Sequence, residues 1–283
     1  MRHTKTVVLC LTSALALAAC EKSGNRDGEV TRALKGVNVI DESNLNDIML
    51  SAADPNEAVV YFQRTLADNP DRIDLQRGLA TSLIRSKRAT EGAVLWKRVT
   101  EHEEATHDDQ ISFADALIRT GDWDRAETVL DAVPPTIETF QRYKLEAVVA
   151  DSNKEWKKAD SFYETAIGLT TAPGSILNNW GYSKLSRGDY RDAERLFGEA
   201  ITYDPTLFTA KNNMVLARAA QKNYTLPLIQ VSQVERAQLL HTMALAAIKQ
   251  GNTNQGKDLL EQAIQTHPQH FEAAVRSLKK LDG

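Results

Sequence analysis

From residue 39 onward, apolar residues recur at the three- and four-residue spacing of a helix face, and strand-like alternation is not sustained over several segments. The clearest example lies in residues 190–203, where Ala193, Phe197 and Ala200 fall at positions i, i+4 and i+7. Pro205 follows this stretch, and a proline stops a helix because it has no backbone N–H to donate. The pattern predicts an all-α protein.

A helix–turn–helix unit is most complete at residues 174–205, GSILNNWGYSKLSRGDYRDAERLFGEAITYDP. It resembles the tetratricopeptide repeat, which has a period of about 34 residues. In this resemblance Gly181 lies where the first helix approaches its neighbour closely, Gly188 closes that helix, and Tyr190 packs across the turn. The same pattern recurs with varying quality at residues 39–70, 73–104, 107–135, 140–171 and 237–268.

Two further segments depart from the regular repeat. Residues 208–224 make a fair first helix, but Pro227 stands where the second helix should begin, which predicts an irregular or shortened second helix. Residues 270–281 suit a terminal capping helix. The resemblance therefore implies an all-α tetratricopeptide-repeat superhelix with about six helix-turn-helix repeats, one degenerate repeat and a C-terminal capping helix. A solenoid of this kind serves as an interaction surface.

The N-terminus has the pattern of an export signal. Arg2 and Lys5 supply positive charge, and an apolar run of 13 residues follows at 7–19. A membrane-spanning helix needs about 20 apolar residues, so the run is too short to cross a bilayer but fits a signal peptide.

The end of this run, Leu17-Ala18-Ala19-Cys20, resembles the bacterial lipobox. The resemblance implies a lipid on the Cys20 thiol, cleavage before that residue, and sorting to the outer membrane because Glu21 rather than Asp follows. A plain secretory signal with an incidental cysteine is the alternative. We therefore expect a signal peptide at 1–19, a lipidated and flexible tether at 20–38, and a repeat solenoid at 39–283, facing the periplasm.

The amino-acid composition argues against some classes of function and structure. Hydrophobic residues make up 42% and charged residues 25% of the 283 residues, which are ordinary globular values. The net charge of −4 and the lack of a long basic run argue against nucleic acid as a partner. The chain has two cysteines, and Cys10 falls inside the predicted signal, so no disulfide framework is expected.

Signatures of catalysis are not found in the sequence. It contains no G-x-S-x-G, H-E-x-x-H or Walker A motif, so we expect no enzyme activity, no cofactor and no small-molecule substrate. The densest group of potential metal ligands, at residues 102–109, falls at a junction between repeats, where a solvated acidic turn is the favoured interpretation and no metal is predicted. The four tryptophans, Trp96, Trp123, Trp156 and Trp180, occupy consensus packing positions, so core packing is favoured over an aromatic peptide-binding site.

The first helix of each repeat is expected to line the concave groove in which such proteins bind partners. Its groove positions are occupied by Arg77, Arg119, Lys144, Asn178, Asn179, Tyr182, Asn212, Asn213 and Leu216. The two Asn-Asn pairs lie one repeat apart, and an Asn side chain can hold both the N–H and the C=O of an extended peptide. The alternative is that one Asn of each pair bonds across the repeat interface. The basic residues would suit a carboxylate or an acidic tail of the partner.

The lipobox, the tether and the repeats, with the segments NNWGYSKLSRGDYRDAERLFGEAI and KNNMVLARAAQKN, together resemble the TadD family of Tad (tight adherence, Flp) pilus-assembly lipoproteins. The resemblance implies an outer-membrane lipoprotein, anchored through Cys20, that helps localise or assemble the pilus secretin by binding it or other Tad components. Two alternatives stay open. One is a repeat lipoprotein of another envelope machine, such as type IV pilus secretin targeting or barrel-protein assembly. The other is an enzyme, or a protein that regulates a cell-wall enzyme.

Overall fold

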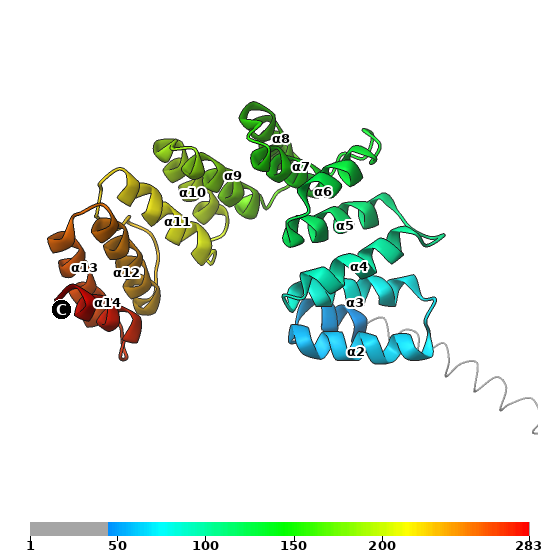
Figure 1. The fold of residues 1–283 in the computed structure, drawn as a ribbon, viewed down its shortest axis with the longest axis horizontal. Coiled ribbons are helices and arrows are strands. Elements are labelled where there is room, and N and C mark those ends of the chain that lie inside the picture. The colour runs from blue at the N-terminus through cyan, green and yellow to red at the C-terminus, as the bar shows by residue number, and fades with distance from the viewer. Residues whose placement is uncertain (1–44, 283) are drawn as a thin grey trace, which may run out of the picture. The chain divides into compact units, whose positions relative to one another are not determined.

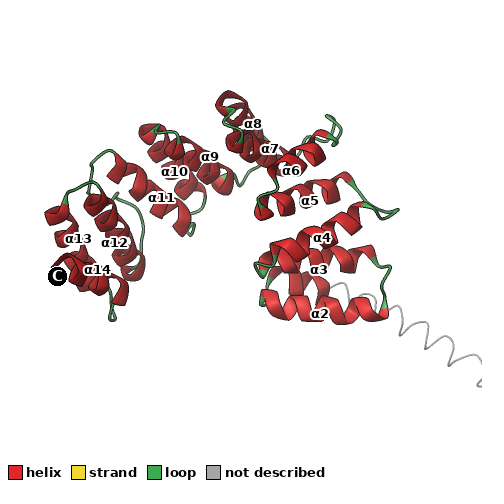
Figure 2. Cartoon of the chain, in the orientation of Figure 1, coloured by secondary structure: helices red, strands yellow, loops and turns green. Residues whose placement is uncertain are grey.

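The computed structural model describes residues 45–282. The predicted signal peptide at 1–19, the tether at 20–38 and the lipidation site Cys20 lie outside the described residues. All regular secondary structure within 45–282 is helical, and this range contains no strand (Figure 2). The predicted all-α fold is confirmed.

The chain divides into two compact units, Met1–Leu95 (unit 1) and Trp96–Gly283 (unit 2). A helical segment at 45–51 precedes the named helices of unit 1. The named helices are α2 (Pro55–Asp68), α3 (Ile73–Arg85), α4 (Ala89–Thr100), α5 (His107–Thr120), α6 (Trp123–Asp131), α7 (Phe140–Ser152), α8 (Trp156–Gly168), α9 (Gly174–Ser186), α10 (Tyr190–Tyr203), α11 (Phe208–Ala220), α12 (Gln233–Lys249), α13 (Thr253–Thr266) and α14 (Glu272–Asp282) (Figure 1).

In unit 1, α2 and α3 pack around a core of Ala58, Phe62 and Leu75. Asp54 caps the N-terminus of α2, and its side chain accepts hydrogen bonds from the first backbone N–H groups of the helix, which have no partner inside it. The Arg85 guanidinium at the end of α3 donates to three carbonyl oxygens near the end of the 45–51 helix. These bonds satisfy carbonyls that a helix C-terminus leaves without partners.

In unit 2 the helices pack as antiparallel pairs, α5 with α6, α7 with α8, α9 with α10, and α12 with α13 (Figure 1). The predicted close approach at Gly181 of α9 is confirmed, because a Cβ at this position would lie 2.7 Å from the Phe197 ring of α10. Tyr190, expected to pack across the turn, is 38% exposed. Phe197 itself is fully buried beside Ala193 and Ala217.

The turns after α3, α5, α7, α9, α11 and α12 each hold one residue in the left-handed conformation, with φ between 61° and 90°. The six residues are Gly121, Gly188, Gly251, Lys87, Lys154 and Lys222. Glycine adopts this conformation without steric cost, whereas a lysine carries a Cβ that crowds the backbone. Three repeats therefore make the same turn with a residue that is poorly suited to it.

The predicted irregularity after α11 is confirmed. Residues 221–232 contain no helix, and α12 follows with a capping box in which Ser232 and Glu235 exchange hydrogen bonds with each other's backbone N–H. Leu226, Ile229 and Val231 pack against the core that α11, α12 and α13 form, in the place of a second helix. Because that helix is missing, α12 packs directly on α11.

The chain ends with α14, which packs on α13 and confirms the predicted capping helix within two residues at each end. His241 of α12 packs edge-on against Phe271, with its Nε2 3.2 Å from the Ser277 hydroxyl of α14. It therefore has a packing role at this end of unit 2. Within the described range, no helix is both long enough and apolar enough to span a bilayer.

Candidate partner-binding cavity

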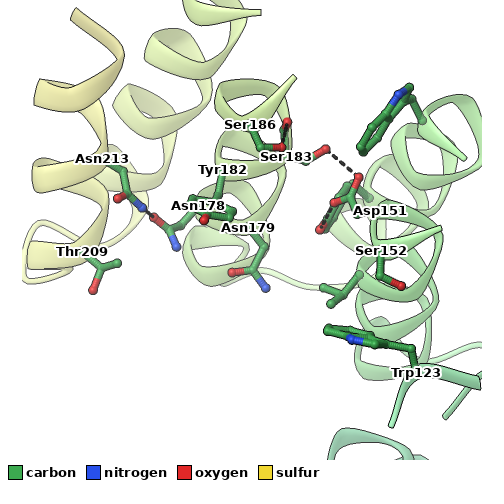
Figure 3. Close-up of a pocket in the computed structure, with 13 residues that line it drawn as sticks. Trp123, Asp151, Ser152, Asn178, Asn179, Tyr182, Ser183, Ser186, Thr209 and Asn213 are labelled. Atoms are coloured by element: carbon green, nitrogen blue, oxygen red, sulfur yellow. Dashed lines mark hydrogen bonds between the residues drawn. The ribbon is translucent and has the colours of Figure 1, made fainter. Parts of the chain in front are cut away.

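A cavity of about 590 Å³ lies within unit 2. It is lined by the first residue of α6, the end of α7, two aromatic residues of α8, and the polar faces of α9 and α11 (Figure 3). Four of the predicted groove residues, Asn178, Asn179, Tyr182 and Asn213, line this one cavity. The repeat arrangement thus brings together side chains that are up to 35 positions apart in the sequence.

The asparagines of the two pairs have different structural roles. The Asn213 side-chain amide donates to the Asn178 carbonyl oxygen at 3.2 Å, so these two bond across the repeat interface. Asn212 Oδ1 accepts from the Thr242 hydroxyl of α12 at 2.8 Å, which also links neighbouring repeats. Asn179 makes no hydrogen bond with its side chain to any described residue, and it points toward the cavity (Figure 3). Asn178, Asn212 and Asn213 therefore bond between repeats, whereas Asn179 faces the cavity as a groove residue would.

The cavity contains one carboxylate, that of Asp151 near the end of α7. Its two oxygens accept hydrogen bonds from the Ser183 hydroxyl at 2.7 Å and the Tyr163 phenol at 2.9 Å. Burial raises the pKa of Asp151 above its ordinary value, although both hydrogen bonds act to lower it. Burial also raises the pKa of Tyr163, which keeps its phenol protonated as a donor.

A second carboxylate, Asp160 of α8, fixes α9 against α8. It accepts from the Trp180 indole N–H at 2.6 Å and from the Lys184 ammonium at 3.0 Å, and it also pairs with Arg187. The Arg187 guanidinium carbon in turn lies 5.6 Å from the centroid of the Trp156 ring. Through this network Lys184 and Arg187 hold α9 and the turn after it against α8.

The four tryptophans lie in different surroundings. Trp96 is buried, as the packing interpretation requires, and Trp180 is half-buried and stacked on Tyr163 with ring centroids 6.1 Å apart. Trp123 and Trp156, however, are half-buried and line the cavity. The interpretation of all four as core residues is therefore wrong for these two, because each is the first residue of a second helix and lies at the end of the groove.

Among the cavity residues, three have side chains that are not used within the described part of the chain. Trp123 makes no ring contact and no hydrogen bond there, and Asn179 and the 60% exposed Tyr182 make no side-chain hydrogen bond. An indole, a carboxamide and a phenol can together contact an extended peptide through ring faces and through donors and acceptors. The cavity thus presents the side chains of Trp123, Asn179 and Tyr182 for binding, in a lining that other hydrogen bonds hold in place.

The other predicted groove residues lie outside the lining of this cavity. Arg119 of α5 is exposed and pairs with Asp115 one turn away at 2.7 Å. Lys144 and Leu216 are half-buried on α7 and α11, and Arg77 belongs to unit 1, on α3. The lining residues, all in the described chain, include no Lys, Arg or His, so the acidic partner expected from the basic residues does not suit this cavity.

The residues at 102–109 have structural roles at the start of α5. Asp109 is buried and accepts from the Thr106 backbone N–H at 2.8 Å, which closes a capping box. The His107 Nδ1 lies 3.0 Å from Gln110 Oε1, and the His102 Nδ1 accepts from the Glu104 N–H. Within residues 45–282, no three or more His, Cys, Asp or Glu side chains are grouped to hold a metal.

One cavity residue, Asp151, could have been found from its spacing in the sequence. Lys144 and Asp151 lie seven residues apart on α7, so both are on one face of the helix, and a groove role for Lys144 implies one for Asp151. Trp123 and Trp156 both stand two residues after the left-handed turn residue, at a spacing of one repeat. Tyr190 stands at the same place after Gly188 but does not line the cavity, so this position alone does not identify a cavity residue.

Comparison with known proteins agrees with this architecture. A family model described as the tetratricopeptide repeat matches residues 239–270, and no curated protein matches the chain. A solved chain of the APC/C Cut9–Hcn1 hetero-tetramer is similar at 13% identity and a TM-score of 0.60, over 83% of this chain and 48% of that chain. This chain therefore spans about half the length of that one.

Two further solved structures are similar. Human IFIT1, crystallised as a dimer with PPP-AAAA, has 14% identity and a TM-score of 0.57 over 80% of this chain and 59% of its own. A tetratricopeptide repeat protein from Parabacteroides merdae has 11% identity and a TM-score of 0.55 over 85% and 97%. At these identities the similarity shows the fold alone. The chain has the all-α tetratricopeptide-repeat fold, which typically serves as a non-catalytic scaffold for binding other proteins.

Proposed function

We propose that this protein is an outer-membrane lipoprotein that binds a protein partner in the cavity of unit 2 and so helps localise or assemble the secretin of a Tad (Flp) pilus. The observation that carries the binding part is the set of unused side chains, Trp123, Asn179 and Tyr182, in one cavity. Their surroundings are fixed by hydrogen bonds between repeats. A rigid lining lowers the ordering cost that binding must overcome.

The pilus part of the proposal is supported by the sequence alone. The lipobox at Cys20 and the segments around the two Asn-Asn pairs resemble those of Tad pilus lipoproteins. A lipid on Cys20 would hold the repeats close to the membrane in which the secretin assembles. Anchoring raises the effective concentration of the partner, so a modest affinity in the cavity is sufficient.

The test of the pilus assignment is the state of the secretin in cells that lack this protein. We expect fewer secretin multimers in the outer-membrane fraction, measured by immunoblotting, with recovery when the wild-type protein is supplied. Unchanged multimers in the deletion strain would contradict the pilus assignment and favour another envelope machine.

The anchor is tested separately with Cys20→Ser. This variant should fold normally and leave the outer-membrane fraction, and it should no longer incorporate radiolabelled fatty acid. Retention of the variant in the outer membrane would contradict the lipid-anchor proposal. Soluble variants that still restore secretin multimers would show that the anchor is dispensable for the function.

A further inference from the structure

We propose that the cavity of unit 2 contains a subsite for a cationic side chain, an arginine or lysine of the bound segment, between the Asp151 carboxylate and the Trp123 ring. The inference rests on the proposed function, in that a partner segment occupies this cavity. Figure 3 shows Asp151 and Trp123 on the same side, with Ser152 between them and with Asn178 and Asn179 facing them from α9.

Asp151 is a half-buried carboxylate that forms no ion pair in the described chain, although the charge of Arg187 acts to lower its pKa. It accepts hydrogen bonds from two neutral hydroxyl groups, those of Ser183 and Tyr163, and no Lys, Arg or His among residues 45–282 forms an ion pair with it. An ionised carboxylate has about four acceptor positions, so two remain open. A buried charge is costly unless it is paired, and a guanidinium or ammonium from a partner would supply the missing charge.

The neighbouring carboxylate, Asp160, has its negative charge paired with cations of the same chain. Asp160, nine residues further along the chain, pairs with both Lys184 and Arg187. Because those cations are held by Asp160, neither forms an ion pair with Asp151. Arg187 also lies over the Trp156 ring, so that ring already has a cationic neighbour.

Trp123 supplies the second half of the subsite. Its ring has no aromatic or cationic neighbour in the described chain, and it is half-buried at the end of the cavity. A tryptophan face attracts a cation more strongly than other aromatic rings do. Asn179, which is also unused, lies across the cavity where it can bond the backbone of the same segment (Figure 3).

The negative charge of Asp151 in the lining also disfavours binding of an acidic segment. None of the described residues that line the cavity is basic, and a carboxylate placed there would be repelled by Asp151. A neutral segment would leave Asp151 buried further and still unpaired. A segment with a cation flanked by apolar residues therefore suits the cavity best.

The test compares two peptides that differ only in charge. Acetyl-Gly-Leu-Arg-Leu-Gly-amide and the same peptide with citrulline in place of arginine are titrated into the full chain by isothermal titration calorimetry. We expect the arginine peptide to bind about tenfold more tightly, which is the scale of a hydrogen bond to a charged group. Asp151→Asn should remove this preference, whereas Asp258→Asn, on the exposed face of α13, should retain it.

Three results would overturn the proposal: equal binding of the two peptides, a preference that survives in Asp151→Asn, or no saturable binding of the arginine peptide to the wild-type protein. Trp123→Leu, which leaves the hydrogen bonds of Asp151 in place, gives a second variant and should weaken the arginine peptide more than the citrulline peptide. Circular dichroism establishes that both variants fold.

The failure of this subsite is distinguishable from failure of the scaffold function. If Asn179→Ala abolishes secretin multimers in cells while Asp151→Asn leaves them intact, the cationic subsite is wrong and the scaffold proposal stands. If both variants leave the multimers intact, the cavity is not the working surface.

Discussion

The side-chain amide of Asn213 on α11 donates a hydrogen bond to the carbonyl oxygen of Asn178 on α9, over 3.2 Å. These residues occupy neighbouring positions of the Asn-Asn pairs in consecutive repeats, and the bond joins the two first helices directly. Asn213 is 9% exposed, so water has little access to its side chain. One asparagine of the first pair is therefore part of the scaffold, and its neighbour Asn179 remains available to a ligand.

This difference predicts that one alanine variant loses stability and the other loses partner binding. Asn213→Ala should lower the free energy of unfolding by about 1 kcal/mol, because it removes a hydrogen bond between helices. Asn179→Ala should change it by less than about 0.5 kcal/mol, because no internal bond is lost, yet it should weaken partner binding. Urea unfolding measures the first effect and peptide titration the second. Equal loss of stability in both variants would contradict the assignment.

A second prediction concerns the contact between Gly181 and Phe197. A methyl group on Gly181 would lie 2.7 Å from the ring, so Gly181→Ala forces the buried Phe197 to move. Overpacking of this kind typically costs about 1–3 kcal/mol. Gly168→Ala is the matched control, since nothing lies within 4 Å of its Cβ position at the end of α8. Thermal unfolding should show a lower midpoint only for Gly181→Ala.

The left-handed turns predict a stabilising substitution. Lys154, after α7, has φ 61°, and Gly188 holds the matching position after α9 with φ 90°. Lys154→Gly should raise the free energy of unfolding by roughly 1 kcal/mol, because glycine avoids the steric cost of this conformation. The reverse change, Gly188→Lys, should lower it by a similar amount. A loss of stability in Lys154→Gly would show that the lysine side chain stabilises the turn by other means.

The two carboxylates on α7 and α8 predict opposite dependences on pH. Desolvation acts to raise the pKa of Asp160, but hydrogen bonds from Arg187, Trp180 and Lys184 lower it below 3.8, whereas burial raises the pKa of Asp151 above 3.8. Asp160 therefore contributes stability that is present above 3.8 and lost as the pH falls through its lowered pKa. Asp151 contributes stability that is present below 3.8 and lost as the pH rises through its raised pKa.

Two asparagine variants measure these contributions. The stability of Asp160→Asn relative to wild type should fall as the pH rises, since the wild type gains stability when Asp160 ionises. The stability of Asp151→Asn relative to wild type should rise as the pH rises through the raised pKa of Asp151, since the variant avoids ionising a carboxyl group that is half-buried. Urea midpoints measured over a series of pH values provide the comparison, and parallel curves for both variants would contradict these directions.

Much of the fold could be predicted from the sequence because helix periodicity and turn glycines are local signals. The face of Ala193, Phe197 and Ala200 and the break at Pro227 each depend on a few neighbouring residues, and both are found in the structure. Position 5 and position 6 of the first helices also identified Asn178 and Asn179 as groove residues. That these positions face the groove is implied by the resemblance to the tetratricopeptide repeat.

The rest of the site depends on contacts between repeats, which no local pattern shows. That Asp151 receives hydrogen bonds from Ser183, 32 residues away, is a property of packing. Lys184 and Arg187 both pair with Asp160 on the neighbouring helix, and no local pattern in the sequence shows this pairing either. The interpretation of Trp123 and Trp156 as core residues was wrong for the same reason, since a consensus position does not say which face of a ring stays open.

The most direct test of the central claim, that the cavity of unit 2 binds the partner, is photo-crosslinking in cells. One probe replaces Tyr182 in the cavity and the other replaces Tyr203 on α10, which has the same 60% exposure but does not line the cavity. We predict that only the Tyr182 probe captures a specific protein, identified by mass spectrometry as a secretin or another pilus component. Capture of the same protein from both positions, or from Tyr203 alone, would contradict the claim.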